Sequence, residues 1–162
     1  MSEPAAFPRP HAGILPPKAL LLSLVAQLPL LALRWPPRPD AWQLAAGASL
    51  LLAGAVLNVW AERLFRRDGV GVCPFTDAPR VVVEGPYRIS RHPMYLGLVF
   101  LCVGACLLTG VLWNLWAPAA LLAYLHVRFV LREEEFLVAR LGAEYERYRG
   151  RHARWLGLPP RD

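Results

Sequence analysis

The chain has 162 residues, 56% of them hydrophobic, and carries 18 Lys and Arg against 12 Asp and Glu. Because the apolar residues form long runs and the cations lie between them, the excess positive charge favours an anionic membrane surface over nucleic acid as its partner. Three cysteines without a CxxC pair argue against a disulfide framework and against a zinc site. Cys102 and Cys106, four residues apart in an apolar run, are expected to pack as small hydrophobes.

The apolar runs predict an all-α protein that is integral to the membrane. Residues 1–14 are Pro-rich without a hydrophobic period and are predicted to be a flexible tail, whereas residues 15–162 are predicted to form one domain. About four runs are candidates to cross a bilayer, namely residues 15–33 (kinked at Pro29), 42–60, 94–113 and the shorter 116–131. Only a few residues separate the last two runs, so they are expected to form a tight antiparallel hairpin.

The second run carries two further signals. Trp42 and Trp60 lie at its ends, where aromatic residues are enriched at a membrane interface. Ala45, Ser49 and Ala53 recur at i, i+4 spacing, which predicts a face of small residues for close contact with a neighbouring helix.

Two polar segments follow the second and fourth runs. The first, residues 61–93, contains Gly and Pro punctuation and a short β-like run at 81–83. The second, residues 132–156, has the pattern of an amphipathic charged helix. Gly142 is expected to interrupt this helix so that its second part folds over a pocket. Tyr145 and Tyr148 are expected to pack that part onto the membrane surface.

The distribution of cations predicts the orientation in the membrane. Six Arg residues lie in 61–93 and eight from Arg128 onward, whereas only Arg34 and Arg38 lie between the first two runs. With four spans, the positive-inside rule places both termini and both polar segments in the cytosol. The two polar segments are therefore expected on the same face of the membrane.

The sequence "GPYRISRHPMYLG", residues 85–97, places Arg88, Arg91 and His92 directly before an apolar run. Charge at such a position is costly unless it has a function, although the arginines alone are also consistent with membrane anchors that reach toward lipid phosphates. Pro93 suits the first turn of a helix, and the N–H groups that follow it are available to an acceptor.

Three consecutive carboxylates, residues 133–135, come just after the fourth run. On a helix at most two of them face inward, and Glu133 and Glu134 share faces with apolar residues. Cations, aromatic rings, a helix N-terminus and carboxylates on one membrane face suit S-adenosylmethionine, which combines a carboxylate, an ammonium, a ribose, an adenine ring and a sulfonium. A nucleotide phosphate could use the same cations.

The chain from about Arg66 to Leu156 resembles the isoprenylcysteine carboxyl methyltransferase family, which groups with the phospholipid methyltransferases. The matching blocks are "RRDGVGVCPF" (66–75), "VVVEGPYRISRHPMYLG" (81–97) and "REEEFLVARLGAEYERYRGRHARWL" (132–156). The resemblance implies a small bundle of membrane helices with a re-entrant hairpin, a cytosolic S-adenosylmethionine pocket and a tunnel for a lipid substrate. The short chain is similar to a compact bacterial form, which implies the bacterial inner membrane.

Combining the resemblance with the arginines noted above, we expect twelve residues at the cofactor. They are Pro79, Arg80, Val81, Val82, Tyr87, Arg91, His92, Pro93, Met94, Tyr95, Glu133 and Glu134. The arginine that contacts substrate in the eukaryotic enzymes has its nearest counterparts in Arg128 and Arg132. Arg128 and Glu134 are the predicted catalytic residues.

The predicted function is therefore S-adenosylmethionine-dependent methyl transfer to a lipid-like acceptor. A carboxylate or thiolate acceptor is already nucleophilic, whereas an amine would need deprotonation by a nearby base such as a glutamate. Two alternatives are a membrane reductase of sterol-like lipids that uses NADPH and a non-catalytic membrane scaffold. A metal site of Cys73, His92 and His126 lacks the usual ligand spacing.

Overall fold

The structure, a computed structural model, describes residues 14–28, 38–67 and 81–156. Within these ranges it contains helices and no strand, which confirms the all-α part of the predicted fold class. The helices longer than one turn are α1 (Pro16–Val25), α3 (Ala41–Arg67), α4 (Pro93–Leu108), α5 (Trp116–Leu125), α6 (Leu131–Leu141) and α7 (Ala143–Arg151). Short helical turns are η2 (Gly85–Arg88), η3 (Leu112–Leu115) and η4 (His126–Val130). The β-like prediction for 81–83 was wrong, since this stretch has no regular secondary structure.

Among the described residues, two helices are long and apolar enough to cross a membrane. One is α3, with 27 residues, and the other is the 30-residue helix Leu112–Leu141, which combines η3, α5, η4 and α6. The predicted spans 15–33 and 94–113 correspond to shorter helices, α1 with 10 residues and α4 with 16. Residues 29–33, with the predicted kink at Pro29, lie outside the described residues.

The helix ends differ from the predicted boundaries for local reasons. α3 continues past Trp60 to Arg67, because the segment contains no helix breaker and Arg66 pairs with Glu62 one turn earlier at 2.7 Å. α4 ends early at Leu108, where the Thr109 hydroxyl donates to the Cys106 carbonyl at 2.6 Å and Gly110 takes a positive φ of 71°. The fourth run continues as helix through residue 131.

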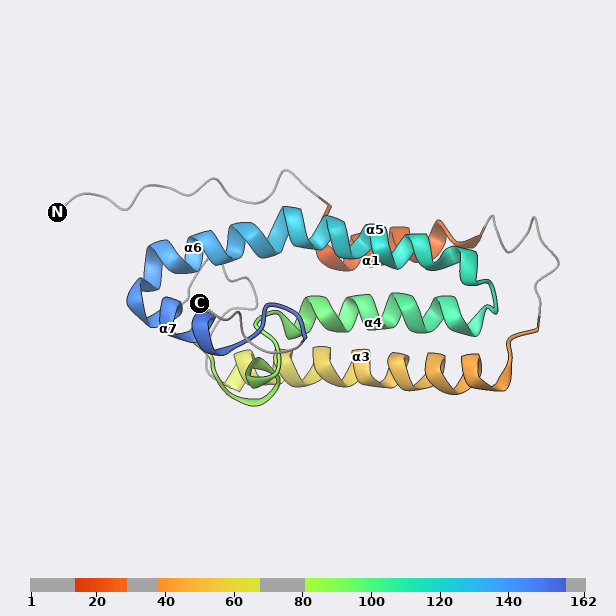
Figure 1. Ribbon diagram of the computed structural model, residues 1–162, viewed down its shortest axis with the longest axis horizontal. Helices are drawn as coiled ribbons and strands as arrows, with labels where there is room; N and C mark the ends of the chain where they lie inside the picture. The colour runs from red at the N-terminus through yellow and green to blue at the C-terminus, as the bar shows by residue number, and fades with distance from the viewer. Residues whose placement is uncertain (1–13, 29–37, 68–80, 157–162) are drawn as a thin grey trace.

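α4 lies in the middle of the helical bundle (Figure 1). α3 packs along one side of α4, and α1 and α5 pack along the other. α4 and α5 run antiparallel and are joined by the short link 109–115, which is the hairpin that the sequence predicts. The predicted division into a tail (1–14) and one domain falls partly outside the described residues.

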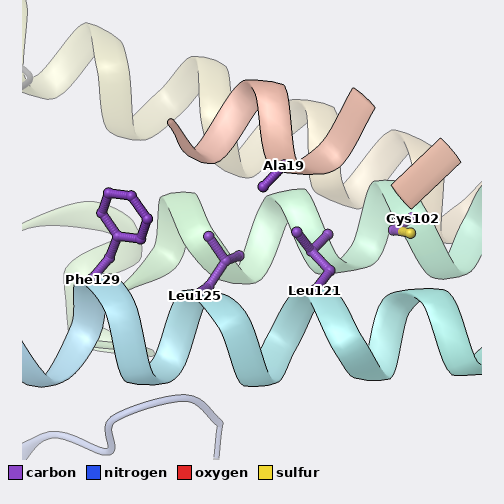
Figure 2. Packing of buried hydrophobic residues seen from close by; sticks show 5 residues of the cluster. All are labelled: Ala19, Cys102, Leu121, Leu125 and Phe129. Carbon is purple, nitrogen blue, oxygen red and sulfur yellow. The ribbon is translucent and has the colours of Figure 1, made fainter. Parts of the chain in front are cut away.

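The core between α1, α4 and α5 is made of small and branched apolar side chains. Figure 2 shows Leu121, Leu125 and Phe129 in a row along one helix face, with Ala19 of α1 and Cys102 of α4 nearby. Cys102 and Cys106 are free and fully buried, which confirms that they pack as small hydrophobes. The Gln27 side-chain amide donates to the Cys102 sulfur at 3.6 Å. This polar side chain, just after α1, therefore also has a hydrogen-bond partner in the core.

The close contact between α3 and α4 is made by glycines. A Cβ on Gly54 would lie 2.7 Å from the Gly97 carbonyl oxygen, and one on Gly104 would lie 2.8 Å from that of Gly47. The predicted contact face of Ala45, Ser49 and Ala53 was wrong, because Ala45 and Ser49 are exposed while Gly47 and Gly54 are buried. The spacing of seven between these glycines returns to the same helix face after two turns.

The outward faces of the bundle are apolar. Only 17% of the most apolar stretch of α3 is buried, and Leu52 is 67% exposed. The helix of a soluble core would be mostly buried, so these side chains have the environment expected of a lipid-facing surface. Trp42 and Trp60, predicted for the interfaces, are 56% and 46% exposed.

Gly142 separates α6 from α7, as predicted. Its φ is +52°, and a Cβ there would meet no atom within 4 Å, so backbone conformation rather than crowding favours glycine. The chain then turns so that Tyr145 and Tyr148 face the protein interior, where they are 2% and 7% exposed. The prediction that these tyrosines lie on the membrane surface was therefore wrong.

Candidate functional site

Three segments distant in the sequence meet at one end of the bundle. They are residues 81–95 leading into α4, the start of α6, and the C-terminal segment, which we define as residues 152–156 (Figure 1). Helix α4 begins at Pro93, with His92 as the residue before it, as the sequence predicts. The predicted inward carboxylates lie at the start of α6, within the continuous helix Leu112–Leu141. The chain that leads into α4 brings its cations close to them.

Glu134 is the centre of this cluster. The residue is 5% exposed, and its carboxylate oxygen Oε1 lies 3.1 Å from His92 Nε2. Arg154 donates to both oxygens, from Nε to Oε1 at 3.0 Å and from Nη2 to Oε2 at 2.8 Å. This two-point contact is the strong planar geometry of an arginine–carboxylate pair, and it raises the pKa of Arg154.

Arg91 adds a second guanidinium to Glu134. Its Nη1 lies 3.3 Å from Glu134 Oε1, and its side chain is 4% exposed. The ion pair lacks hydrogen-bond geometry, since Arg91 Nε and Nη1 have no hydrogen-bond partner within the described residues. Arg91 is thus a buried cation with donors still available, which distinguishes it from the exposed Arg88. Of the two arginines that could have been membrane anchors, only Arg88 has the exposure of one.

Glu133 faces the same region from the adjacent position. Its Oε2 lies 3.7 Å from His92 Nδ1, and the Tyr95 hydroxyl forms a hydrogen bond with its carboxylate. The Tyr95 ring stacks on the His92 ring with centroids 5.8 Å apart and an angle of 18°. Glu133 Oε2 nevertheless has no hydrogen-bond partner within the described ranges. Both glutamates therefore turn inward as predicted, while Glu135 is exposed.

Three tyrosines close the cluster on the side of α7. The Tyr148 hydroxyl donates to the Tyr87 carbonyl at 2.9 Å, which joins α7 to η2. Burial raises the pKa of Tyr87, Tyr145 and Tyr148, so all three stay neutral at physiological pH. Tyr145 OH is buried with no hydrogen-bond partner in the part of the chain that the structure describes.

The C-terminal segment is held against the start of α4 by main-chain contacts. The Arg91 N–H donates to the Ala153 carbonyl at 3.0 Å, and the Ser90 hydroxyl donates to the Arg154 carbonyl at 3.1 Å. The Trp155 ring lies beside two histidine rings, with centroids 6.4 Å from His92 and 6.2 Å from His126. The segment therefore packs over the cluster at this end of the bundle.

The remaining predicted cofactor residues lie around this cluster. Val82 and Met94 pack with Tyr87 against the C-terminal end of α3, and the Val81 N–H donates to Glu144 at 3.2 Å. Pro79 and Arg80 lie outside the described residues. Arg128, a predicted catalytic residue, is half-buried in the π-helical turn η4, before the glutamates on the same continuous helix. Such turns are frequent at functional sites.

Arg154, Trp155 and Ser90 belong to the cluster but were not predicted as site residues. The block "RHARWL" was noted only as part of the resemblance, since the positions of 152–156 depend on the turn after α7. An arginine followed by tryptophan at the end of a basic helix was the available signal. No group of three or more His, Cys, Asp or Glu placed to hold a metal occurs among the described residues.

The start of α4, buried cations and carboxylates form a candidate site at the end of a helical bundle, beside helices long and apolar enough to cross a membrane. The model of the family described as phospholipid methyltransferase matches residues 42–144. The match covers more than half of the chain, and the chain therefore belongs to this methyltransferase family. No curated protein and no solved structure matches the chain.

Proposed function

We propose that this protein is an integral-membrane methyltransferase that uses S-adenosylmethionine and acts on a lipid-like, membrane-partitioned acceptor. The observation that carries the proposal is the buried site at the start of α4 in a member of a methyltransferase family. His92, Glu133, Glu134 and Arg91 converge there beside two helices with the length and composition of membrane spans.

The residues of the site fit the cofactor by their available polar atoms. Arg91 Nε and Nη1 and the Tyr145 hydroxyl are buried donors without a hydrogen-bond partner within the described ranges, and they suit a carboxylate. Glu133 Oε2 is a buried acceptor that likewise has no hydrogen-bond partner within the described ranges, and it suits an ammonium or a ribose hydroxyl. When bound, S-adenosylmethionine supplies a methyl group on a positively charged sulfur.

The two glutamates are assigned different tasks. Both oxygens of Glu134 are engaged by donors of His92 and Arg154. Glu133 keeps one buried oxygen available, so we assign direct cofactor contact to Glu133. Glu134 fixes the orientation of the His92 ring through Nε2, on the side of the ring opposite to Glu133. Rings of Tyr87 and Tyr95 are proposed as aromatic walls of the pocket, with Val81, Val82, Pro93 and Met94 completing it.

Arg128 is proposed to bind the polar head of the acceptor. It precedes the glutamates on the continuous helix Leu112–Leu141 and therefore lies deeper on the membrane side of the site. An arginine at that position can orient a carboxylate or a phosphate by its planar fork. Transfer from a sulfonium is an in-line displacement, so positioning of the acceptor is the main requirement on the protein.

The proposed topology has four spans. The short helices α1 and α4, packed within the bundle, belong to two of them. Both termini and the cofactor pocket lie in the cytosol, and the membrane is the bacterial inner membrane. The short helix α4 lies between α3 and the α1–α5 pair, so its apolar surface is covered by protein on both sides.

The testing experiment is thermal stabilisation of the detergent-purified protein. We expect S-adenosylhomocysteine to raise the unfolding temperature and NADPH to leave it unchanged, because only a ligand that binds the native state shifts the equilibrium. Stabilisation by NADPH alone would favour a reductase. If neither ligand changes the unfolding temperature, a non-catalytic scaffold is favoured.

A further inference from the structure

We infer that Arg154 is a positioning residue of the site and that the C-terminal segment is an integral part of it. This inference rests on the proposed function for its ligand. Arg154 lies beyond residues 42–144, the range that the family model matches. It reaches the site through one residue, Glu134, and therefore acts on the ligand indirectly.

The first support is that the segment is anchored independently of the Arg154 side chain. The Arg91 N–H bonds the Ala153 carbonyl at 3.0 Å, and the Ser90 hydroxyl bonds the Arg154 carbonyl at 3.1 Å. Ser90 is 1% exposed and Ala153 is 6% exposed, so these contacts are shielded from water. Removing the guanidinium should leave the segment in place, because the main-chain bonds remain.

The second support is the asymmetry of burial in the ion pair. The Arg154 side chain is 37% exposed, whereas that of Glu134 is 6% exposed. Arg154 therefore closes the cytosolic side of a buried carboxylate. Its fork bonds both oxygens, which fixes the plane of the carboxylate as well as its position.

The third support is the path from Arg154 to the proposed ligand contact. Glu134 Oε1 holds His92 Nε2 at 3.1 Å, and His92 Nδ1 then faces Glu133 Oε2 at 3.7 Å. A rotation of the Glu134 carboxylate would turn the His92 ring away from Glu133. Arg154 thus sets the geometry of the pair that meets the cofactor, without touching the cofactor itself.

The first experiment needs no cofactor. The chain has four histidines, so ¹⁵N-labelled histidine in the full-length protein yields a small set of ring signals that His→Gln variants assign. In Arg154→Gln we expect the His92 ring signal to move. The His126 signal should stay, because His126 contacts Trp155 rather than Arg154. Arg149→Gln is the matched control, since the exposed Arg149 pairs with the exposed Glu146 on α7, at 3.0 Å.

Two results of this experiment would overturn the inference. An unmoved His92 signal in Arg154→Gln would show that Arg154 does not orient the ring. Joint movement of the His92 and His126 signals would show that the whole segment has detached, which is a structural role. Both readings hold whether or not the protein binds S-adenosylhomocysteine, so they are separate from the test of the proposed function.

The second experiment is calorimetric titration with S-adenosylhomocysteine. We expect Arg154→Gln to bind about tenfold more weakly than wild type, the scale of a lost charged hydrogen bond. Arg154→Lys should be intermediate, because it keeps the charge and loses the fork. Adding guanidinium ion at low concentration should restore affinity to Arg154→Ala and leave Arg149→Ala unchanged, since the Arg154 position is open to solvent.

Two outcomes of the titration contradict a positioning role. Tighter binding by Arg154→Gln would mean that Arg154 occupies the place of the ligand. Loss of affinity without rescue by guanidinium or Lys would mean that the substitution acts through the fold. Absence of binding to wild type would instead contradict the proposed function, and the histidine spectra would then still decide the role of Arg154.

Discussion

At the residue scale, the site is organised by one buried carboxylate among several cations. Glu134 faces His92 and the guanidinium groups of Arg91 and Arg154. A buried charge is tolerated only with such partners, and removing one partner leaves the others uncompensated. Glu133 lies next to it but keeps an oxygen without a hydrogen-bond partner within the described ranges. Two adjacent glutamates therefore have different physical roles.

This difference predicts unequal losses of stability for two isosteric substitutions. Glu134→Gln should lower the free energy of unfolding by about 3 kcal/mol, because the buried Arg91 loses its anion. It should also weaken cofactor binding through His92. Glu133→Gln should weaken cofactor binding with a much smaller loss of stability. Thermal unfolding and calorimetric titration of both variants separate the two roles, and equal stability of the two would contradict them.

The helix-start residues offer a second test. We expect His92→Ala and Tyr95→Ala each to weaken S-adenosylhomocysteine binding by about 1–3 kcal/mol, typical of a lost polar partner or packed aromatic ring. Arg88→Ala is the control, since Arg88 is exposed on the same segment. Titration of folded variants measures this. Unchanged affinity in both site variants would place the cofactor elsewhere.

Arg128 is predicted to separate binding of the acceptor from binding of the cofactor. Arg128→Lys keeps the charge and loses the planar fork, so we expect near-normal cofactor affinity and reduced methyl transfer. The measurement combines titration with a transfer assay on candidate lipid carboxylates, thiols and amines. Loss of cofactor binding in Arg128→Lys would assign this residue to the cofactor instead.

At the scale of elements, α3 and α4 approach each other through glycine. A Cβ on Gly54 would meet the Gly97 carbonyl oxygen at 2.7 Å, and backbone on both sides leaves little room to adjust. Close approach of this kind allows the extended van der Waals contact that drives helix association in lipid. The position of α3 along α4 also brings Phe65 against Tyr87 of η2, with ring centroids 5.4 Å apart.

We therefore expect Gly54→Ala to destabilise the protein by about 1–3 kcal/mol, the scale of overpacking. Gly150→Ala in α7 is the matched control, because a Cβ there meets no atom within 4 Å. That change should be neutral or slightly stabilising, since Ala favours helix over Gly. The measurement is thermal unfolding in detergent, and similar losses for both variants would argue against the tight contact.

At the scale of the whole molecule, the helices place the site and the α4–α5 turn at opposite ends. The start of α3 and the link 109–115 lie at one end of the bundle, and α6, α7 and the start of α4 lie at the other (Figure 1). Apolar side chains face outward between these ends, as the 67% exposure of Leu52 illustrates. This distribution is what the proposed topology requires, with the site at one membrane face.

Cysteine labelling tests this orientation. In a background without the native thiols, Arg38→Cys and Trp113→Cys should react with an impermeant reagent from the non-cytosolic side. Glu84→Cys and Arg149→Cys should react only from the cytosolic side, as positive charge inside requires. All four positions are exposed in the structure. Labelling of Trp113→Cys from the cytosol would contradict the hairpin and the location of the pocket.

The sequence by itself determined the helical class, most of the helix positions and many residues of the site. Local signals were sufficient for these features: apolar runs for helices, Pro93 for the start of α4 and Gly142 for the break before α7. Helical periodicity also indicated that Glu133 and Glu134 turn inward. Each of these inferences depends on residues within a few turns of one another.

Only the tertiary structure decided which partners these residues meet. Residues 90 and 154, or 92 and 134, are far apart along the chain, and their contacts depend on the turns after α4, α6 and α7. The turn after α6 directs Tyr145 and Tyr148 inward, and the packing of α3 on α4 selects Gly47 and Gly54, not Ala45 and Ser49, for the contact. A periodic pattern defines the faces of a helix, but the neighbour that covers each face is set by packing of the whole bundle.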